Sequence, residues 1–263
     1  MTVPFEQRVF PAMQSGLPCK ATLVGFCPAS NMTPALVERL VLETEEVIGE
    51  PIRHTIRKLF PKKLDRSIAD EVELAWKSRK RVLMLSNQLS RPNHVLITAN
   101  RFPRPHGGSY PADFGVFCIG VNNTAPRALD LLTRLQTYAT LSGAFMARVD
   151  SPTWMESTDA VLKEHGLAPE TFFPRIRFIS ENGWGISERF GWGTYIGPRC
   201  ALVFGSLDTP EVIEWCADGG AVVWLTKAPF DFRNEAHFSR HKALMKELSD
   251  HLHPGAQVSE LSE

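Results

Sequence analysis

Two histidines near the carboxyl end of the chain have the spacing of a metal-binding pair. His237 and His241 are four residues apart in a segment that predicts a helix, so both lie on one helical face, and His251 and His253 follow shortly after. The zinc-protease pattern requires a glutamate directly after the first histidine, and Phe238 stands there instead. We therefore favour ordinary histidines of a helix surface and predict no metal site.

The possible nucleophiles and phosphate-binding glycines also lack the context that their chemistry needs. Cys118 lies among apolar residues of a predicted strand, where a thiol is usually inert core. Ser187 lacks the G-x-S-x-G elbow because Arg189 occupies the position of the last glycine. The segments Gly183-Trp-Gly185 and Gly191-Trp-Gly193 carry a tryptophan where a dinucleotide phosphate would approach. The sequence thus predicts no catalytic residue and no cofactor.

Charge gives little support for a nucleic-acid or membrane partner. Lys plus Arg and Asp plus Glu number 29 each, and the isoelectric point is about 7.1, so no overall field attracts a polyanion. Residues 51–65 are locally basic, but acidic residues flank them and a single phenylalanine, Phe60, provides little aromatic interleaving for base stacking. We interpret this stretch as a solvated face.

The most unusual segment of the chain is rich in glycine and aromatic residues. Between Asn182 and Arg199 it contains five glycines and four aromatic rings. Glycine permits close backbone approach, and large rigid rings serve equally in a core or at a protein interface. The sequence leaves open whether these rings close the core or form an interaction surface.

Composition indicates a globular protein with a reduced interior. The chain has 263 residues, of which 43% are apolar, enough for one large domain or two smaller ones. Its five cysteines are an odd number and include no C-x-x-C pair, which argues against a disulfide framework or a zinc ribbon. The amino terminus lacks the pattern of a signal peptide, and no apolar run is long enough for a membrane helix. We expect a cytoplasmic protein.

The first half of the chain predicts alternating strands and amphipathic helices. Residues 21–26 read as a buried strand, and Thr33-Pro34 caps a helix that Gly49 ends. Ser67 caps a second helix, and residues 82–85 and 95–99 predict an antiparallel hairpin. A strand over 114–121, a helix starting at Thr124-Ala-Pro126 and a strand over 143–149 follow.

The resulting order predicts an α+β fold with antiparallel-rich sheets and helices on one face. We expect residues 1–150 to form a ferredoxin-like βαββαβ half. Residues 151–263 predict a second α+β half packed on the first. It includes the segment 182–204, strands over 212–216 and 221–226, and a last helix capped by Asn234.

Several motifs resemble one family of bacterial proteins. Gly191-Trp-Gly-Thr-Tyr-Ile-Gly-Pro198 precedes a predicted short helix, and Ala221-Val-Val-Trp-Leu-Thr precedes a closing helix with Ala243-Leu-Met-Lys-Glu-Leu248. Leu23-Val-Gly-Phe26, Phe114-Gly-Val-Phe117 and Leu141-Ser-Gly-Ala-Phe145 add similarity in the first half. The pattern resembles the type VI immunity family and the related immunity-52 family of polymorphic-toxin systems.

This resemblance implies a cytoplasmic protein that binds a cognate toxin and occludes its active site, with no chemistry of its own. Two alternatives remain. An enzyme that reverses the toxin's modification would have a deep pocket lined by groups such as His106, Asp113, Glu188 and Arg189. A ferredoxin-like small-molecule binding protein would have a ligand cavity and no toxin partner.

For toxin binding, the candidates are charged and aromatic side chains that we expect in exposed loops. They are Arg104, His106, Tyr110, Trp184, Glu188, Arg189, Phe190 and Trp192.

Overall fold

The computed structural model describes most of the predicted strands and helices. The described residues are 21–57, 60–78, 82–87, 95–102, 114–121, 130, 133–150, 176–178, 185–187, 191–201, 207–227 and 234–252.

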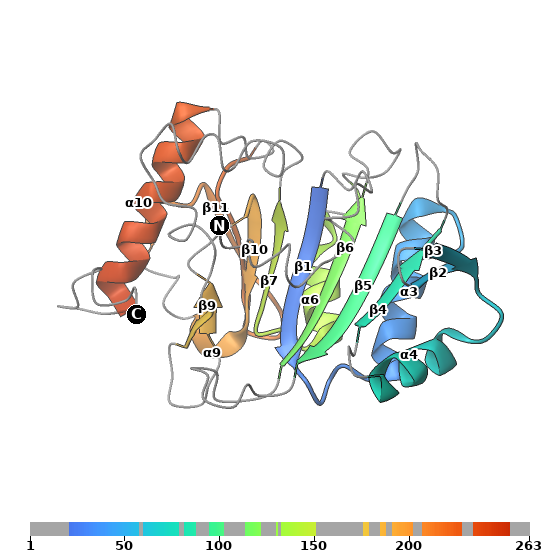
Figure 1. The fold of residues 1–263 in the computed structure, drawn as a ribbon. Coiled ribbons are helices and arrows are strands. Elements are labelled where there is room, and N and C mark those ends of the chain that lie inside the picture. The colour runs from blue at the N-terminus through green and yellow to red at the C-terminus, as the bar shows by residue number, and fades with distance from the viewer. Residues whose placement is uncertain are drawn as a thin grey trace, which may run out of the picture.

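The described residues form one ten-stranded antiparallel sheet that runs through the molecule (Figure 1). Its strands lie side by side in the order β11-β12-β10-β7-β1-β6-β5-β4-β2-β3. In chain order they are β1 (Ala21–Pro28), β2 (His54–Arg57), β3 (Phe60–Lys63), β4 (Val82–Ser86), β5 (Val95–Phe102), β6 (Phe114–Val121), β7 (Met146–Asp150), β10 (Gly193–Ile196), β11 (Val212–Trp215) and β12 (Ala221–Trp224). A separate two-stranded sheet contains β8 (Ile176–Phe178) and β9 (Gly185–Ser187).

The middle of the large sheet confirms the split βαβ arrangement predicted for the first half. Strands β7, β1, β6 and β5 are neighbours, and every neighbouring pair is antiparallel. Strands β1 and β5 therefore run parallel with β6 between them, as a split βαβ unit requires. The α+β class and the predicted hairpin of residues 82–85 and 95–99 are both confirmed, with Leu85 opposite Ile97.

The first helix, α3 (Pro34–Ile48), begins and ends at the predicted signals. The Thr33 hydroxyl accepts a hydrogen bond from the Leu36 amide at 3.2 Å, and Pro34 occupies the first turn. Gly49 adopts the left-handed conformation, with φ of 70°, and its amide donates to the Glu45 carbonyl. The local sequence is sufficient to place this helix.

The other described helices are α4 (Ile68–Lys77), α6 (Leu135–Ser142), α9 (Pro198–Ala201) and α10 (Glu235–Leu252). Ser67 caps α4 as predicted. The strand predicted from Gly143 begins at Met146, because Gly143 ends α6 in the left-handed conformation with φ of 58°. The predicted helix start at Thr124-Ala-Pro126 lies outside the described residues.

The main core lies between one face of the sheet and the helices. Leu23, Phe117 and Ala147 of the sheet belong to the same buried cluster as Leu40 of α3 and Tyr138 of α6. The two helices are also joined by a hydrogen bond of 3.0 Å between the hydroxyls of Thr44 and Tyr138. Burial raises the pKa of the Tyr138 phenol to about 12, so this hydroxyl stays neutral at physiological pH.

The opposite face of the sheet is buried as well, but it carries several polar side chains. Strand alternation and register place Thr22, Thr98, Arg148 and Thr194 on this face, and each is at most 1% exposed. Arg148 lies at the centre of the sheet, opposite Val24 on one side and Thr194 on the other.

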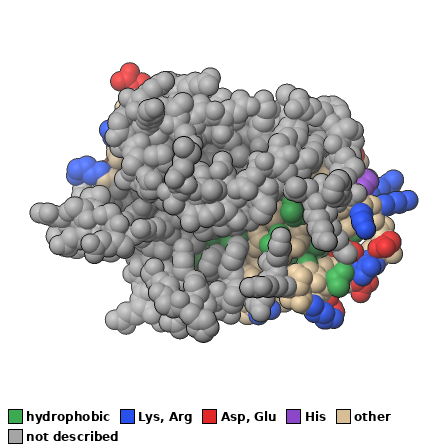
Figure 2. Space-filling model, viewed as in Figure 1, with side chains coloured by type: hydrophobic (Ala, Val, Ile, Leu, Met, Phe, Trp, Pro, Cys, Tyr) green, Lys and Arg blue, Asp and Glu red, His purple; other side chains and the backbone are tan. Residues whose placement is uncertain are grey.

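The basic stretch folds as a hairpin, which the sequence did not predict. Strands β2 and β3 pair through residues 54–57 and 60–63 and form one end of the sheet. Arg53, Lys62 and Lys63 are exposed there, and charged side chains of both signs gather at this end of the molecule (Figure 2). The solvated interpretation of this stretch agrees with that exposure.

The carboxyl-terminal strands extend the same sheet. Strand β10 pairs with β7 on one side and with β12 on the other, so elements from the regions 1–150 and 151–263 share one continuous sheet. Helix α10 lies at the far end (Figure 1), where Arg240 forms an ion pair of 3.3 Å with Glu211. Within the described part of the chain, no helix has the length and apolar character needed to cross a membrane.

Replacing Thr33 by Ala removes the side-chain acceptor at the start of α3. We expect the free energy of unfolding to fall by about 1 kcal/mol, measured by urea denaturation. Thr33→Ser keeps the acceptor and serves as the control; equal losses in both variants would contradict the capping role.

Candidate functional site

Most of the predicted contact residues lie outside the described part of the chain. These are Arg104, His106, Tyr110, Trp184, Glu188, Arg189 and Phe190. Asp113, which was placed with His106, Glu188 and Arg189 in the alternative enzyme pocket, also lies outside it. Only Trp192 of the eight predicted binding residues can be located.

Trp192 is a core residue, so its expected position in an exposed loop is wrong. Its side chain is only 6% exposed, and its indole N–H donates to the Thr226 carbonyl at 2.8 Å. Its ring packs against Trp224, with 5.2 Å between the ring centroids. An indole whose hydrogen-bond donor and faces are already satisfied inside the chain is a poor anchor for a partner.

The glycines beside Trp192 serve the same internal packing. A Cβ on Gly193 would lie 2.5 Å from the Trp224 ring, and a Cβ on Gly197 would lie 3.1 Å from the Ala144 carbonyl oxygen. Gly193 therefore requires a residue without a side chain, and a side chain at Gly197 would crowd the neighbouring backbone. Residues 191–197 of the glycine- and aromatic-rich segment, all of them buried, thus form a tight internal crossing.

Tyr195 on β10 fixes the turn between β11 and β12. Its buried hydroxyl donates to Oδ2 of Asp218 at 2.8 Å, and Thr140 of α6 donates to the same oxygen at 3.3 Å. The Gly220 amide donates to the other carboxylate oxygen at 2.9 Å. Burial raises the pKa of Tyr195, and the hydrogen bond to Asp218 raises it further, so the phenol remains a proton donor.

The turn holds strand β11, which carries a large exposed aromatic ring. Trp215 is 53% exposed. Strand alternation places its ring on the polar face of the sheet and Glu214 on the helix face. The Glu214 carboxylate accepts a hydrogen bond of 3.1 Å from the Trp224 indole. We name Ile213, Glu214 and Trp215 the β11 edge, because β11 is the last strand at this end of the described sheet.

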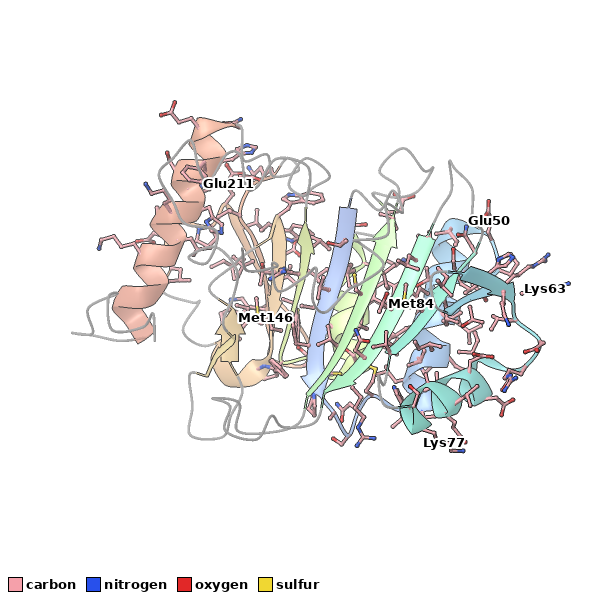
Figure 3. All side chains as sticks on the ribbon, viewed as in Figure 1. Glu50, Lys63, Lys77, Met84, Met146 and Glu211 are labelled. Atoms are coloured by element: carbon pink, nitrogen blue, oxygen red, sulfur yellow. The ribbon has the colours of Figure 1, made fainter. Side chains whose placement is uncertain are left out.

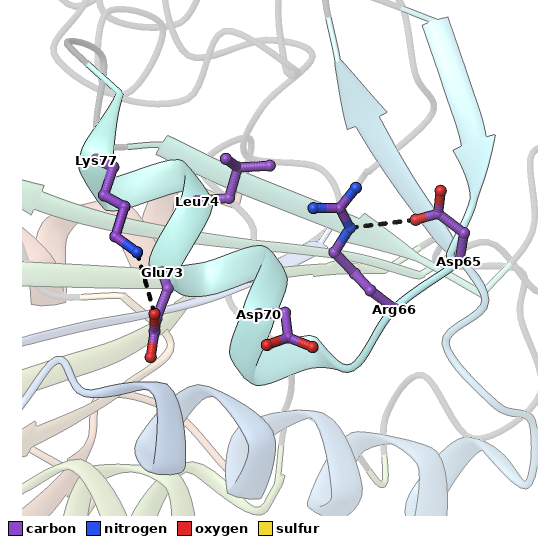
Figure 4. Close-up of a pocket in the computed structure, with 6 residues that line it drawn as sticks. All are labelled: Asp65, Arg66, Asp70, Glu73, Leu74 and Lys77. Atoms are coloured by element: carbon purple, nitrogen blue, oxygen red, sulfur yellow. Dashed lines mark hydrogen bonds and ion pairs between the residues drawn. The ribbon is translucent and has the colours of Figure 1, made fainter.

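A shallow pocket of about 390 Å³ lies at the other end of the molecule, along α4 (Figure 4). Its charged side chains pair with one another: Arg66 contacts Asp65 at 3.3 Å, and Lys77 contacts Glu73 at 3.3 Å. The lining residues are Asp65, Arg66, Asp70, Glu73, Leu74 and Lys77. Exposed ion pairs of this kind are solvated and contribute little to the free energy of folding or binding. The pocket is therefore a weaker candidate for a binding site than the β11 edge.

The described cysteines and histidines show no assembled reactive group. Burial raises the pKa of Cys27 to about 12, and burial together with the charges of Asp218 and Glu214 raises the pKa of Cys216, so neither thiol ionises readily. His241 is buried on α10 and His237 is partly buried, so the expectation of a helix-surface histidine is wrong for His241. No cluster of three or more metal-ligating side chains occurs among the described residues.

The chain matches no protein-family model and no curated protein. The resemblance to the immunity families therefore stays a prediction that rests on the motifs given above.

Sequence reasoning missed Trp215 although it predicted the strand that carries it. The pattern Val212-Ile-Glu-Trp215 indicates a strand. It does not tell whether that strand is central or last in a sheet, and only the last position leaves the ring exposed.

The two tryptophans give opposite expectations for stability. Trp192→Ala leaves a cavity and removes the indole hydrogen bond to the Thr226 carbonyl, and we expect it to lower the free energy of unfolding by about 3–5 kcal/mol. Trp215→Ala removes a ring that is half in solvent, and we expect a loss of no more than about 1 kcal/mol. Urea denaturation of both variants measures the difference. Similar losses would show that Trp215 also supports the core.

Proposed function

We propose that this chain is an immunity protein that binds a cognate secreted antibacterial toxin and neutralises it by occluding its active site. The toxin would be a type VI secretion effector or a related polymorphic toxin, and the complex would form in the cytoplasm of the producing cell. The resemblance of the motifs to the immunity families supports this class of protein.

The observation that carries the proposal is the exposed ring of Trp215 on a strand that is held in place. Tryptophan is among the residues that contribute most to protein interfaces. The Trp215 ring is 53% exposed at the end of the sheet. Its burial against a partner would stabilise the complex by about 25 cal/mol for each Å² of apolar surface removed from water.

The residues around Trp215 limit the conformational entropy that is lost on binding. Hydrogen bonds from Tyr195, Thr140 and Gly220 to Asp218 fix the turn that follows β11. A surface ordered before binding loses less conformational entropy in the complex. The β11 edge thus offers the preformed surface that occlusion requires.

Electrostatics give this surface a preference among partners. The segment 208–218 contains four acidic residues, Asp208, Glu211, Glu214 and Asp218, and no lysine or arginine. Arg240 of α10 pairs with Glu211 at 3.3 Å, so the excess negative charge of the segment comes from the other three carboxylates. Charge complementarity accelerates association and rejects partners of like charge. We expect the contacted region of the toxin to be basic.

We expect Trp215→Ala to weaken binding at least tenfold without a matching loss of stability. The partner in this test is the toxin domain encoded by the gene adjacent to that of this chain. Isothermal titration calorimetry measures the dissociation constant, and thermal unfolding checks the fold of each variant.

Leu42→Ala is the matched control, since Leu42 is also a large exposed apolar residue, at 61%, but lies on α3. If the neighbouring gene product forms no complex with the unmodified chain, the proposed function is wrong. If Trp215→Ala and Leu42→Ala bind as tightly as the unmodified chain, the site lies elsewhere on the protein.

A further inference from the structure

We propose that the outer side of β11 accepts an extended basic segment of the toxin as an eleventh strand of the sheet. This inference rests on the proposed function and specifies how the partner is held. It follows from the backbone of β11, from the contrast between the two ends of the sheet, and from charge.

The hydrogen-bond pattern of β11 directs two residues outward. The Cys216 amide donates to the Gly220 carbonyl at 2.8 Å, so Cys216 faces β12. In an antiparallel ladder, alternate residues bond to the same neighbour. Glu214 and Val212 therefore also face β12, while the amides and carbonyls of Ile213 and Trp215 point away from it. These are the groups that an added strand would pair with.

The two end strands of the sheet, β3 and β11, differ in whether they contain residues that oppose pairing with a further strand. At one end, β3 carries Pro61, which has no amide hydrogen, followed by the exposed lysines Lys62 and Lys63. Proline and lysine are the residues with which proteins protect edge strands from pairing. Figure 3 shows Lys63 and Glu211 at opposite ends of the molecule. The β11 end has neither proline nor lysine within the strand.

The side chains of the β11 edge fit an added strand on both faces. Trp215 and the partly buried Ile213 lie on one face and would pack against apolar residues of the incoming segment. Glu214 lies on the other face, where a lysine or arginine of the partner would stand opposite its carboxylate. A segment with alternating basic and apolar residues satisfies both faces at once.

Charge also decides against a second copy of this chain as the occupant. Pairing of β11 with β11 of another copy would bring together two segments that each carry Asp208, Glu214 and Asp218 in addition to the ion-paired Glu211. Like charges on adjacent strands destabilise the pair. A basic segment of another protein removes this repulsion.

Hydrogen exchange measured by mass spectrometry tests strand addition directly. The full chain is compared alone and in complex with the toxin domain of the adjacent gene, which is the probe throughout. We expect the amides of Ile213 and Trp215 to exchange at least tenfold more slowly in the complex. No slowing at these two amides in a stable complex would overturn the inference and leave the proposed function standing.

Two pairs of variants separate backbone pairing from packing and charge. Ile213→Pro and Ile213→Thr both remove the isoleucine side chain, but only proline removes the outward amide hydrogen, and we expect the proline variant to bind at least tenfold more weakly than the threonine variant. Glu214→Gln keeps an acceptor for the Trp224 indole and removes the charge. The affinity of this variant for the toxin domain should be severalfold lower than that of the unmodified chain and should depend less on salt concentration. Glu73→Gln on α4 is the control for charge removal elsewhere.

Each outcome of these measurements is decisive. Equal affinities of Ile213→Pro and Ile213→Thr, with both folded by circular dichroism, would overturn strand addition. If Ile213→Pro does not fold, the exchange rates of the unmodified chain decide instead. A dimer of this chain in sedimentation that Ile213→Pro abolishes would assign the edge to a second copy. Failure to form any complex would remove the proposed function and the inference together.

Discussion

The pairing of β7 with β10 is the contact on which the rest of the structure depends. It sets Gly193 opposite Val149 and Tyr195 opposite Ala147, and so joins strands that are more than forty residues apart in the chain. Strand β12 then pairs with the free side of β10, and β11 pairs with β12. The position of Trp215 at the end of the sheet follows from this register.

The same register explains why the aromatic residues of this region divide between core and surface. The absence of a side chain at Gly193 leaves room for the Trp224 ring, which in turn packs on Trp192. Tyr195 reaches Asp218, which also receives the Thr140 hydroxyl of α6. The buried rings of Trp192 and Tyr195, together with the partly buried ring of Trp224, thus fix the last two strands against the sheet and its helix, while Trp215 remains available to a partner. A rigid scaffold behind an exposed anchor is the arrangement that keeps the entropic cost of binding low.

Local signals made much of the first half predictable. Thr33 with Pro34, Gly49 and Ser67 mark helix ends through hydrogen bonds within a few residues, and the strands of residues 21–28 and 114–121 are continuous apolar runs. The β2–β3 hairpin was missed because Pro61 and the basic residues around it lack the apolar alternation of an ordinary strand. The sequence patterns do not show which strands pair when they are far apart in the chain. The eighteen-residue segment with Trp192 therefore could not be divided between core and surface, and Trp215 could not be recognised as exposed. The predicted contacts other than Trp192 stay predictions.

The central claim is that this chain protects by covering a toxin without transforming it. The most direct test is a titration of the adjacent gene's purified toxin, at a concentration well above the dissociation constant, with increasing amounts of this protein. If the chain acts by occlusion, toxin activity falls in proportion to the protein added and reaches zero at one equivalent. Complete neutralisation at a small fraction of one equivalent would contradict the account and indicate an enzyme.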